Sequence, residues 1–99
     1  MANFILSYDL NGPRPSHAEM DKHLGLLGAG FVQARVLETV WYVAGPTTVD
    51  RLRNYVQSIL SANDQVLVVE ASRAAWANLK VDGVAFKSAF EAQPASLAA

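Results

Sequence analysis

The sequence predicts a small α+β domain, and two observations support this prediction. Apolar segments of strand length alternate with segments whose apolar residues recur every three or four positions, as they do in helices. The chain has 99 residues, which leaves room for a single core. Of these residues 52% are hydrophobic and only 17% are charged, against ~25% charged in a typical soluble domain. We therefore expect a homo-oligomer, in which a partner surface covers the surplus of apolar residues.

The first two elements are a strand and a helix. Residues 3–10 form an apolar run, and the turn formers of residues 11–13 end it, so a strand is predicted there. Ser16 and Glu19 have the spacing of a capping box, in which each side chain satisfies a free backbone N–H of the first helical turn. A helix should therefore begin at Ser16 and end near the glycines of residues 28–30, which tolerate the left-handed conformation.

A hairpin, a helix and a strand follow. Residues 31–44 are rich in β-branched and aromatic side chains but too long for one strand, so we expect a hairpin with its turn near residues 37–38. Thr47 or Thr48 caps a second helix that reaches residue 59, where apolar residues keep helical spacing. The unbroken apolar centre of residues 65–71 predicts the last strand.

The C-terminal segment predicts further helix. Ser72 has the chemistry to cap a short helix through residue 79, and residues 84–92 form a second helical face after a turn. We divide the chain into a domain of residues 1–76 and a C-terminal extension of residues 77–99. The Ala- and Ser-rich end of this extension has too little surface to bury and is expected to fray.

The predicted order is strand, helix, strand, strand, helix, strand. This is the ferredoxin-like βαββαβ pattern, in which both helices lie on one face of a four-stranded antiparallel sheet. Successive residues of a strand point to opposite faces of the sheet, and these strands carry apolar residues on both faces. The second face of the sheet therefore also needs a cover. Either a second copy meets the chain through its sheet, or the C-terminal segment folds back over it.

The overall composition excludes several function classes. Without cysteine, the chain has no disulfide, no thiolate nucleophile and no cysteine-ligated metal. The formal net charge of −1 provides no general attraction for nucleic acid. No stretch approaches the ~20 apolar residues that span a bilayer, and the N-terminus has no basic leader, so we expect a cytoplasmic protein with no membrane contact.

Asp9 is the main candidate for chemistry. A carboxylate at the end of an apolar strand is an oxygen ligand that suits magnesium or manganese. One carboxylate per chain is too few for a site, but a two-fold dimer brings two copies together. The alternative is structural: Asp9 shapes the turn that follows by accepting hydrogen bonds from backbone N–H groups.

The histidines offer a weaker metal site. His17 and His23 are six residues apart on the predicted helix, which places them on different sides of it. Glu19 and His23 are four apart and could share an ion, but an exposed pair of this kind is typical of solvated surface. Among the aromatic residues, Trp41 is expected in the core or at an interface.

Three blocks of the sequence resemble a known family. The blocks "FILSYDLNGP", "ARVLETVWYVAG" and "SANDQVLVVEA" occur in the order found in small bacterial proteins of the SinR family. These proteins are similar to the CRISPR-associated Cas-two proteins and to the VapD-type toxin ribonucleases. The resemblance covers roughly residues 3–76.

The resemblance implies a ferredoxin-like homodimer and several site residues. Asp9 matches the aspartate that ends the family's first strand and is assigned to metal binding between two subunits. Thr39 stands where relatives often have a serine, and Arg35 lies near a position that is often basic. With Arg14, these two residues are candidates for nucleic-acid contact.

Two functions are compatible with this resemblance. The Cas-two group implies magnesium- or manganese-dependent cleavage of RNA or DNA, an endonuclease activity. It also implies a non-catalytic role in bridging integrase subunits on DNA, so the alternative is a dimeric interaction or scaffold protein of the same fold. The chain lacks the strongly basic surface of a DNA-bridging dimer, which weakens the case for nucleic acid in particular.

Overall fold

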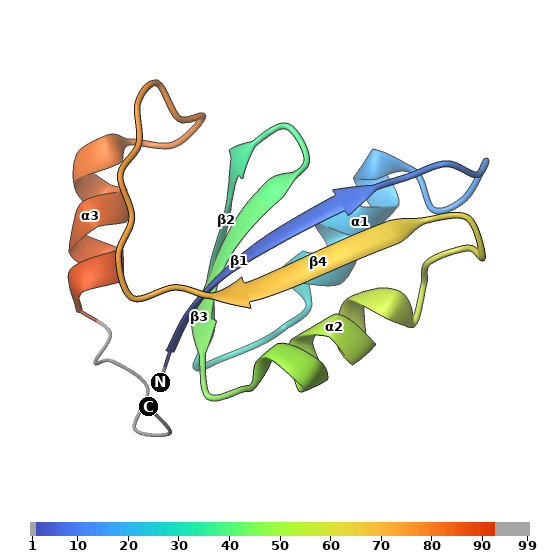
Figure 1. The fold of residues 1–99 in the computed structure, drawn as a ribbon, viewed down its shortest axis with the longest axis horizontal. Coiled ribbons are helices and arrows are strands. Elements are labelled where there is room, and N and C mark those ends of the chain that lie inside the picture. Colours follow the sequence, from blue (N-terminus) through green and yellow to red (C-terminus); the bar gives the residue numbers. More distant parts are fainter. Residues whose placement is uncertain (1, 93–99) are drawn as a thin grey trace.

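The computed structural model describes residues 2–92 and confirms an α+β architecture with a four-stranded antiparallel sheet (Figure 1). Its elements are β1 (Ala2–Asp9), α1 (His17–Gly25), β2 (Val32–Leu37), β3 (Val40–Gly45), α2 (Val49–Gln57), β4 (Gln65–Glu70) and α3 (Gly83–Glu91). The strands lie in the order β2-β3-β1-β4. This arrangement is compatible with the ferredoxin-like fold. The predicted fraying concerns the end after Pro94, which lies outside the described residues.

Local sequence signals set the bounds of the first two helices. The Ser16 hydroxyl accepts from the Glu19 backbone N–H at 3.2 Å, and Glu19 Oε1 accepts from the Ser16 N–H at 3.0 Å, which confirms the capping box. Helix α1 ends at Gly25, a few residues before the predicted stop at residues 28–30. Helix α2 is capped by Thr48, whose hydroxyl accepts from the Arg51 N–H at 3.2 Å.

Helices α1 and α2 cover one face of the sheet. The side chains of Leu6 and Tyr8 on β1 point toward these helices, because alternate residues of a strand share a face. They form a buried cluster with Met20, Leu24, Trp41 and Val56. Trp41 is only 7% exposed, so its predicted place in the core is confirmed.

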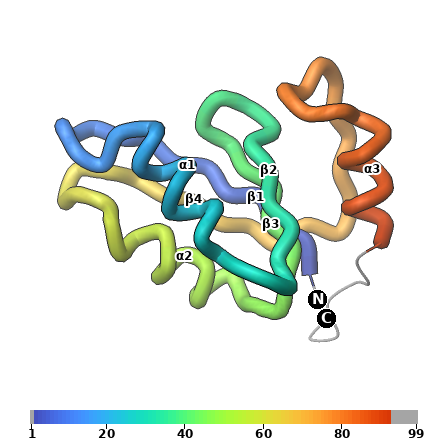
Figure 2. Tube along the Cα trace, turned by 180° about the vertical axis from the view of Figure 1, so that it is seen from behind, coloured from blue at the N-terminus to red at the C-terminus, as the bar shows by residue number. Residues whose placement is uncertain are grey.

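Helix α3 covers part of the second face. Figure 1 shows α1 and α2 together at one end of the molecule and α3 at the other, and the reverse view in Figure 2 agrees. Phe86 and Phe90 of α3 pack on Tyr42 and Ala44 of β3. The ring centroids of Tyr42 and Phe86 lie 5.0 Å apart in an edge-to-face arrangement. For this part of the sheet, the C-terminal segment folds back, which was one of the two predicted covers.

Asn3 fixes α3 to the sheet. Its side-chain amide donates to the Phe90 carbonyl at 2.9 Å, and its Oδ1 accepts from the Tyr42 hydroxyl at 2.6 Å. Asn3 is 6% exposed, so both hydrogen bonds are shielded from water. Because a buried amide without partners is costly, this network specifies where the end of α3 docks.

The predicted helix over residues 72–79 is wrong. These residues form no regular element, and Asn78 has a φ of +55°, which a continuing helix does not accommodate. The segment packs instead: the Trp76 ring lies 4.6 Å from the Phe86 ring, and the Lys80 N–H donates to the Val36 carbonyl at 2.9 Å. A helix of two turns has little stability of its own, so tertiary packing decides the conformation.

Residues 2–92 cover only in part a strip of the second face between β1 and β4. Ile5, Ser7 and Asp9 of β1 lie opposite Val69, Leu67 and Gln65 of β4, respectively. Leu67 is 63% exposed and Val69 is 42% exposed. We call these six residues the open strip. No helix within residues 2–92 is long and apolar enough to cross a membrane.

Candidate metal site at the end of strand β1

Asp9 is the last residue of β1 and is exposed at the end of the open strip. Its partner across the sheet is Gln65, the first residue of β4. Together with Ser7 and Leu67, these two residues line a shallow depression of about 230 Å³. The depression therefore combines one carboxylate with the neutral oxygens of a hydroxyl and an amide.

The turn after β1 is held by Asp64 and not by Asp9. Asp64 Oδ1 accepts from the Asn11 backbone N–H at 2.6 Å, and its Oδ2 accepts from the Ser61 N–H at 2.8 Å. These backbone hydrogen bonds hold the pKa of Asp64 below its ordinary value. Within residues 2–92, no hydrogen bond or ion pair involves the Asp9 carboxylate. The alternative role, in which Asp9 shapes the turn by accepting hydrogen bonds from backbone N–H groups, therefore lacks those hydrogen bonds.

One chain does not complete a metal site at Asp9. In the described part of the chain, no three His, Asp or Glu side chains gather closely enough to hold an ion. The donors that line the depression are all oxygen atoms, as magnesium and manganese prefer. The residues present thus fit such an ion chemically but supply too little negative charge alone.

Arg14 and Arg35 are each paired elsewhere. Arg14, in the loop before α1, forms an ion pair with Glu19 and remains 81% exposed. The hydrogen bond from Arg14, followed by that from the Ser16 backbone, lowers the pKa of Glu19 to about 2. Arg35 lies opposite Trp41 on the helix-covered face, and its guanidinium is 3.8 Å from the Asp21 carboxylate. The structure does not bring either arginine to Asp9.

Thr39 lies beside the end of β1. It belongs to the β2–β3 turn, which falls at residues 38–39 as predicted to within one residue. Its carbonyl accepts from the Tyr8 N–H at 3.2 Å, next to Asp9 in the chain. Of the three predicted nucleic-acid contacts, Thr39 is therefore the one that the hydrogen bonding places near Asp9.

A buried polar cluster under α1 was missed by sequence reasoning. The Tyr8 hydroxyl, the Trp41 indole N–H and Asp21 Oδ1 are buried, and none has a hydrogen-bond partner within residues 2–92. Burial raises the pKa of Tyr8, while the nearby Trp41 indole lowers it more weakly. One signal for this cluster was present in the sequence: Asp21 directly follows Met20, which belongs to the buried apolar stripe of α1.

The histidines do not form a metal site with Glu19. His23 packs against Tyr55 of α2, with ring centroids 4.1 Å apart and nearly parallel planes. His23 Nε2 lies 2.7 Å from the Tyr55 carbonyl, and the Tyr55 hydroxyl donates to the His23 carbonyl at 2.6 Å. Glu19 is held by Arg14 and Ser16. The expectation of a plainly solvated pair is wrong for His23, which joins the two helices.

No protein-family model matches the sequence, and no curated protein matches it at a significant level.

Proposed function

We propose that the protein is a cytoplasmic, ferredoxin-like homodimer in which two Asp9 carboxylates, one from each copy, share a magnesium or manganese ion. This ion-dependent site cleaves phosphodiester bonds of RNA or DNA. The single observation that carries this proposal is an exposed carboxylate with no hydrogen bond or ion pair in the described chain, at the end of the open strip. The resemblance to the SinR, Cas-two and VapD proteins supports the same role for Asp9.

The open strip supports the proposed dimer. Leu67 and Val69 present apolar surface next to the polar end at Asp9, and a second copy of the same strip would bury both residues. A two-fold contact is self-complementary, so residues near its axis meet their own copies. With the axis near Ser7 and Asp9, two carboxylates come together. Their mutual repulsion opposes the dimer unless a cation lies between them.

Each chain supplies defined groups to the reaction. A divalent ion held there provides a bound water of lowered pKa and neutralises charge on the phosphate. The Asp9 carboxylates bind the ion, while the Gln65 amide and the Ser7 hydroxyl can donate hydrogen bonds to a phosphate oxygen. The Thr39 carbonyl accepts from the Tyr8 N–H, so this residue lies next to the end of β1. Because the net charge is −1, binding depends on these local groups and on the ion.

The test is cleavage of single-stranded RNA and duplex DNA with magnesium, with manganese and with chelator. We expect cleavage that depends on the ion and is lost in Asp9→Asn. Glu91→Gln is the matched control, because this carboxylate is exposed at the end of α3, far along the chain from the open strip. Equal activity of Asp9→Asn and the wild type would remove the mechanism.

The second candidate is a non-catalytic dimeric scaffold. It is favoured by the lack of a preformed group of three metal ligands within residues 2–92, since the open strip explains a dimer without any reaction. This candidate predicts a stable dimer by light scattering and no metal-dependent cleavage. A monomer at micromolar concentration counts against both candidates.

A further inference from the structure

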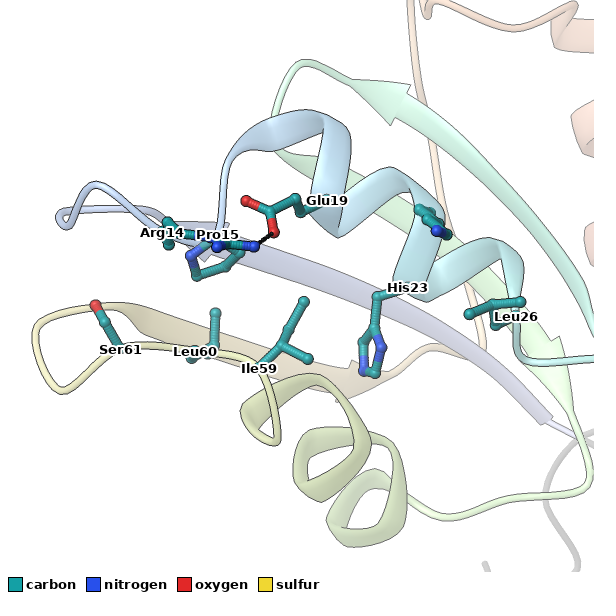
Figure 3. A pocket seen from close by; sticks show the side chains of 9 residues that line it. Arg14, Pro15, Glu19, His23, Leu26, Ile59, Leu60 and Ser61 are labelled. Carbon is teal, nitrogen blue, oxygen red and sulfur yellow. Dashed lines mark hydrogen bonds and ion pairs between the residues drawn. The ribbon is translucent and has the colours of Figure 1, made fainter.

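Two loops lie side by side beyond the end of β1. One joins β1 to α1 and the other joins α2 to β4, and Figure 1 shows both at the same end of the molecule. Figure 3 shows Arg14 and Pro15 of the first loop beside Ser61 of the second. The approach is close, since a Cβ added at Gly12 would lie 2.9 Å from Ser61 Oγ. The contact between the loops therefore favours glycine at position 12.

Asn11 and Asp64 tie the two loops together. The Asn11 backbone N–H donates to Asp64 Oδ1 at 2.6 Å, and the Asn11 side-chain amide donates to the Asn63 carbonyl at 2.9 Å. The Ser61 N–H donates to Asp64 Oδ2 at 2.8 Å. We call these three hydrogen bonds the clasp. They fix the chain that leaves β1 against the chain that enters β4.

The clasp contains a chemically reactive dipeptide. The backbone nitrogen that follows an asparagine can attack the side-chain carbonyl carbon, and a following glycine leaves this approach unhindered because it has no Cβ. The chain has five asparagines, and Asn11 is the one that glycine follows. Asn11 is also exposed in an irregular loop, so water reaches its side chain.

We propose that Asn11 is a modification site at which the chain deamidates spontaneously, at a rate set by the clasp. The Gly12 nitrogen forms a bond to Asn11 Cγ, the Cγ–Nδ2 bond breaks, and Nδ2 leaves as ammonia with the proton of the Gly12 N–H. Water then opens the cyclic imide. Cleavage of the new bond gives aspartate at position 11, and cleavage of the other imide bond gives isoaspartate. The net reaction consumes water and releases ammonia.

The closed clasp keeps the reacting atoms apart. Asn11 Nδ2 is bound to the Asn63 carbonyl. Hydrogen bonds from the Asn11 and Ser61 N–H groups, with a smaller contribution from the Gly12 N–H, hold the pKa of Asp64 below its ordinary value. The Gly12 N–H is therefore directed at Asp64 and must turn away from it before ring closure. Deamidation thus follows the fraction of time that the clasp is open.

The product prevents the clasp from closing again. A carboxylate at position 11 has no N–H to donate to the Asn63 carbonyl, and its negative charge lies near that of Asp64. Isoaspartate also lengthens the backbone after β1. The modification therefore loosens the chain two residues beyond Asp9. The inference itself does not depend on metal binding or catalysis at Asp9.

Mass spectrometry of proteolytic fragments tests the proposal. The full chain is incubated at mildly alkaline pH, and the mass increase of an amide-to-acid change is then assigned to a residue. We expect this increase at Asn11 before it occurs at Asn54, Asn63 or Asn78, each of which precedes a residue with a side chain. In the chain unfolded by urea, where the clasp is absent, Asn11 should react faster.

Variants test the control by the clasp. Asp64→Asn removes the charge from the hydrogen bonds and should raise the rate about ten-fold in protein that circular dichroism shows to be folded, whereas Asp50→Asn on α2 should leave it unchanged. The ratio of the wild-type rates in urea and in buffer makes the same test without a substitution. Asn11→Asp, which imitates the product, should accelerate amide exchange at the Ser61 N–H. No mass increase at Asn11, equal rates in buffer and urea, or unchanged exchange in Asn11→Asp would overturn the proposal.

Discussion

Removal of the Asn3 side chain is expected to destabilise the whole fold, because this amide joins β1, β3 and α3. Asn3→Ala leaves the Tyr42 hydroxyl and the Phe90 carbonyl without their present partners. Each buried polar group that loses its partner costs roughly 1–3 kcal/mol. We therefore expect the free energy of unfolding to fall by about 3 kcal/mol, a large share of the ~5–15 kcal/mol typical of a domain.

A double-mutant cycle sharpens this prediction. Tyr42→Phe alone removes one hydroxyl and leaves Asn3 Oδ1 unpaired, at a cost of about 1–2 kcal/mol. In the Asn3→Ala background the same change should cost much less, since the hydroxyl is already without its partner. The two effects are therefore expected to be less than additive, as is usual for groups in direct contact.

Urea unfolding of each variant, followed by tryptophan fluorescence, measures these free energies. Asn63→Ala is the matched control, because its side chain is exposed in a turn, and its effect should stay within about 0.5 kcal/mol. Amide exchange in α3 should accelerate in Asn3→Ala. A loss below about 1 kcal/mol for Asn3→Ala, or strict additivity in the cycle, would refute the role given to this network.

Three further predictions concern other parts of the chain. The pKa of Glu19 should be near 2 by NMR titration and should rise toward 4.5 in Arg14→Gln. Because the folded-state pKa is depressed, the ionised carboxylate stabilises the fold above about pH 4.5. This contribution to stability disappears as the pH falls toward 2. Trp41→Ala should lower the free energy of unfolding by about 3–5 kcal/mol in urea titrations, unlike a surface change such as Arg73→Ala. Leu67→Glu should convert the dimer into a monomer in sedimentation experiments, and this monomer should melt at no lower a temperature than the wild-type monomer. An unchanged mass would argue against the open strip as the interface.

Local signals in the sequence predicted the elements that local chemistry controls. The capping box at Ser16 and Glu19 set the start of α1, and the β-branched run over residues 31–44 produced the hairpin. The helix over residues 84–92 was also predicted to within one residue, from the spacing of Phe86 and Phe90. Side-chain periodicity and end signals are properties of a few neighbouring residues, so no knowledge of the tertiary fold was needed.

Other features depend on contacts between distant residues. The segment that contains Trp76 was predicted as helix, but its indole packs on Phe86 and its conformation follows that contact. The role of Asn3 depends on a carbonyl 87 residues away, and no local pattern marks it. Asp9 was found from its place at the end of a strand. That Asp64 holds the following turn, and leaves Asp9 without a hydrogen bond in the described chain, required the structure.

The stoichiometry of manganese binding tests the paired Asp9 site most directly. Calorimetric titration of the full chain with Mn²⁺ should give one ion for every two chains, with the ion also increasing the fraction of dimer in sedimentation, because it removes the repulsion between the carboxylates. Asp9→Asn should abolish this binding, and Glu91→Gln should not. One ion per chain, no binding at all, or binding that survives in Asp9→Asn would contradict a site shared between two copies of Asp9.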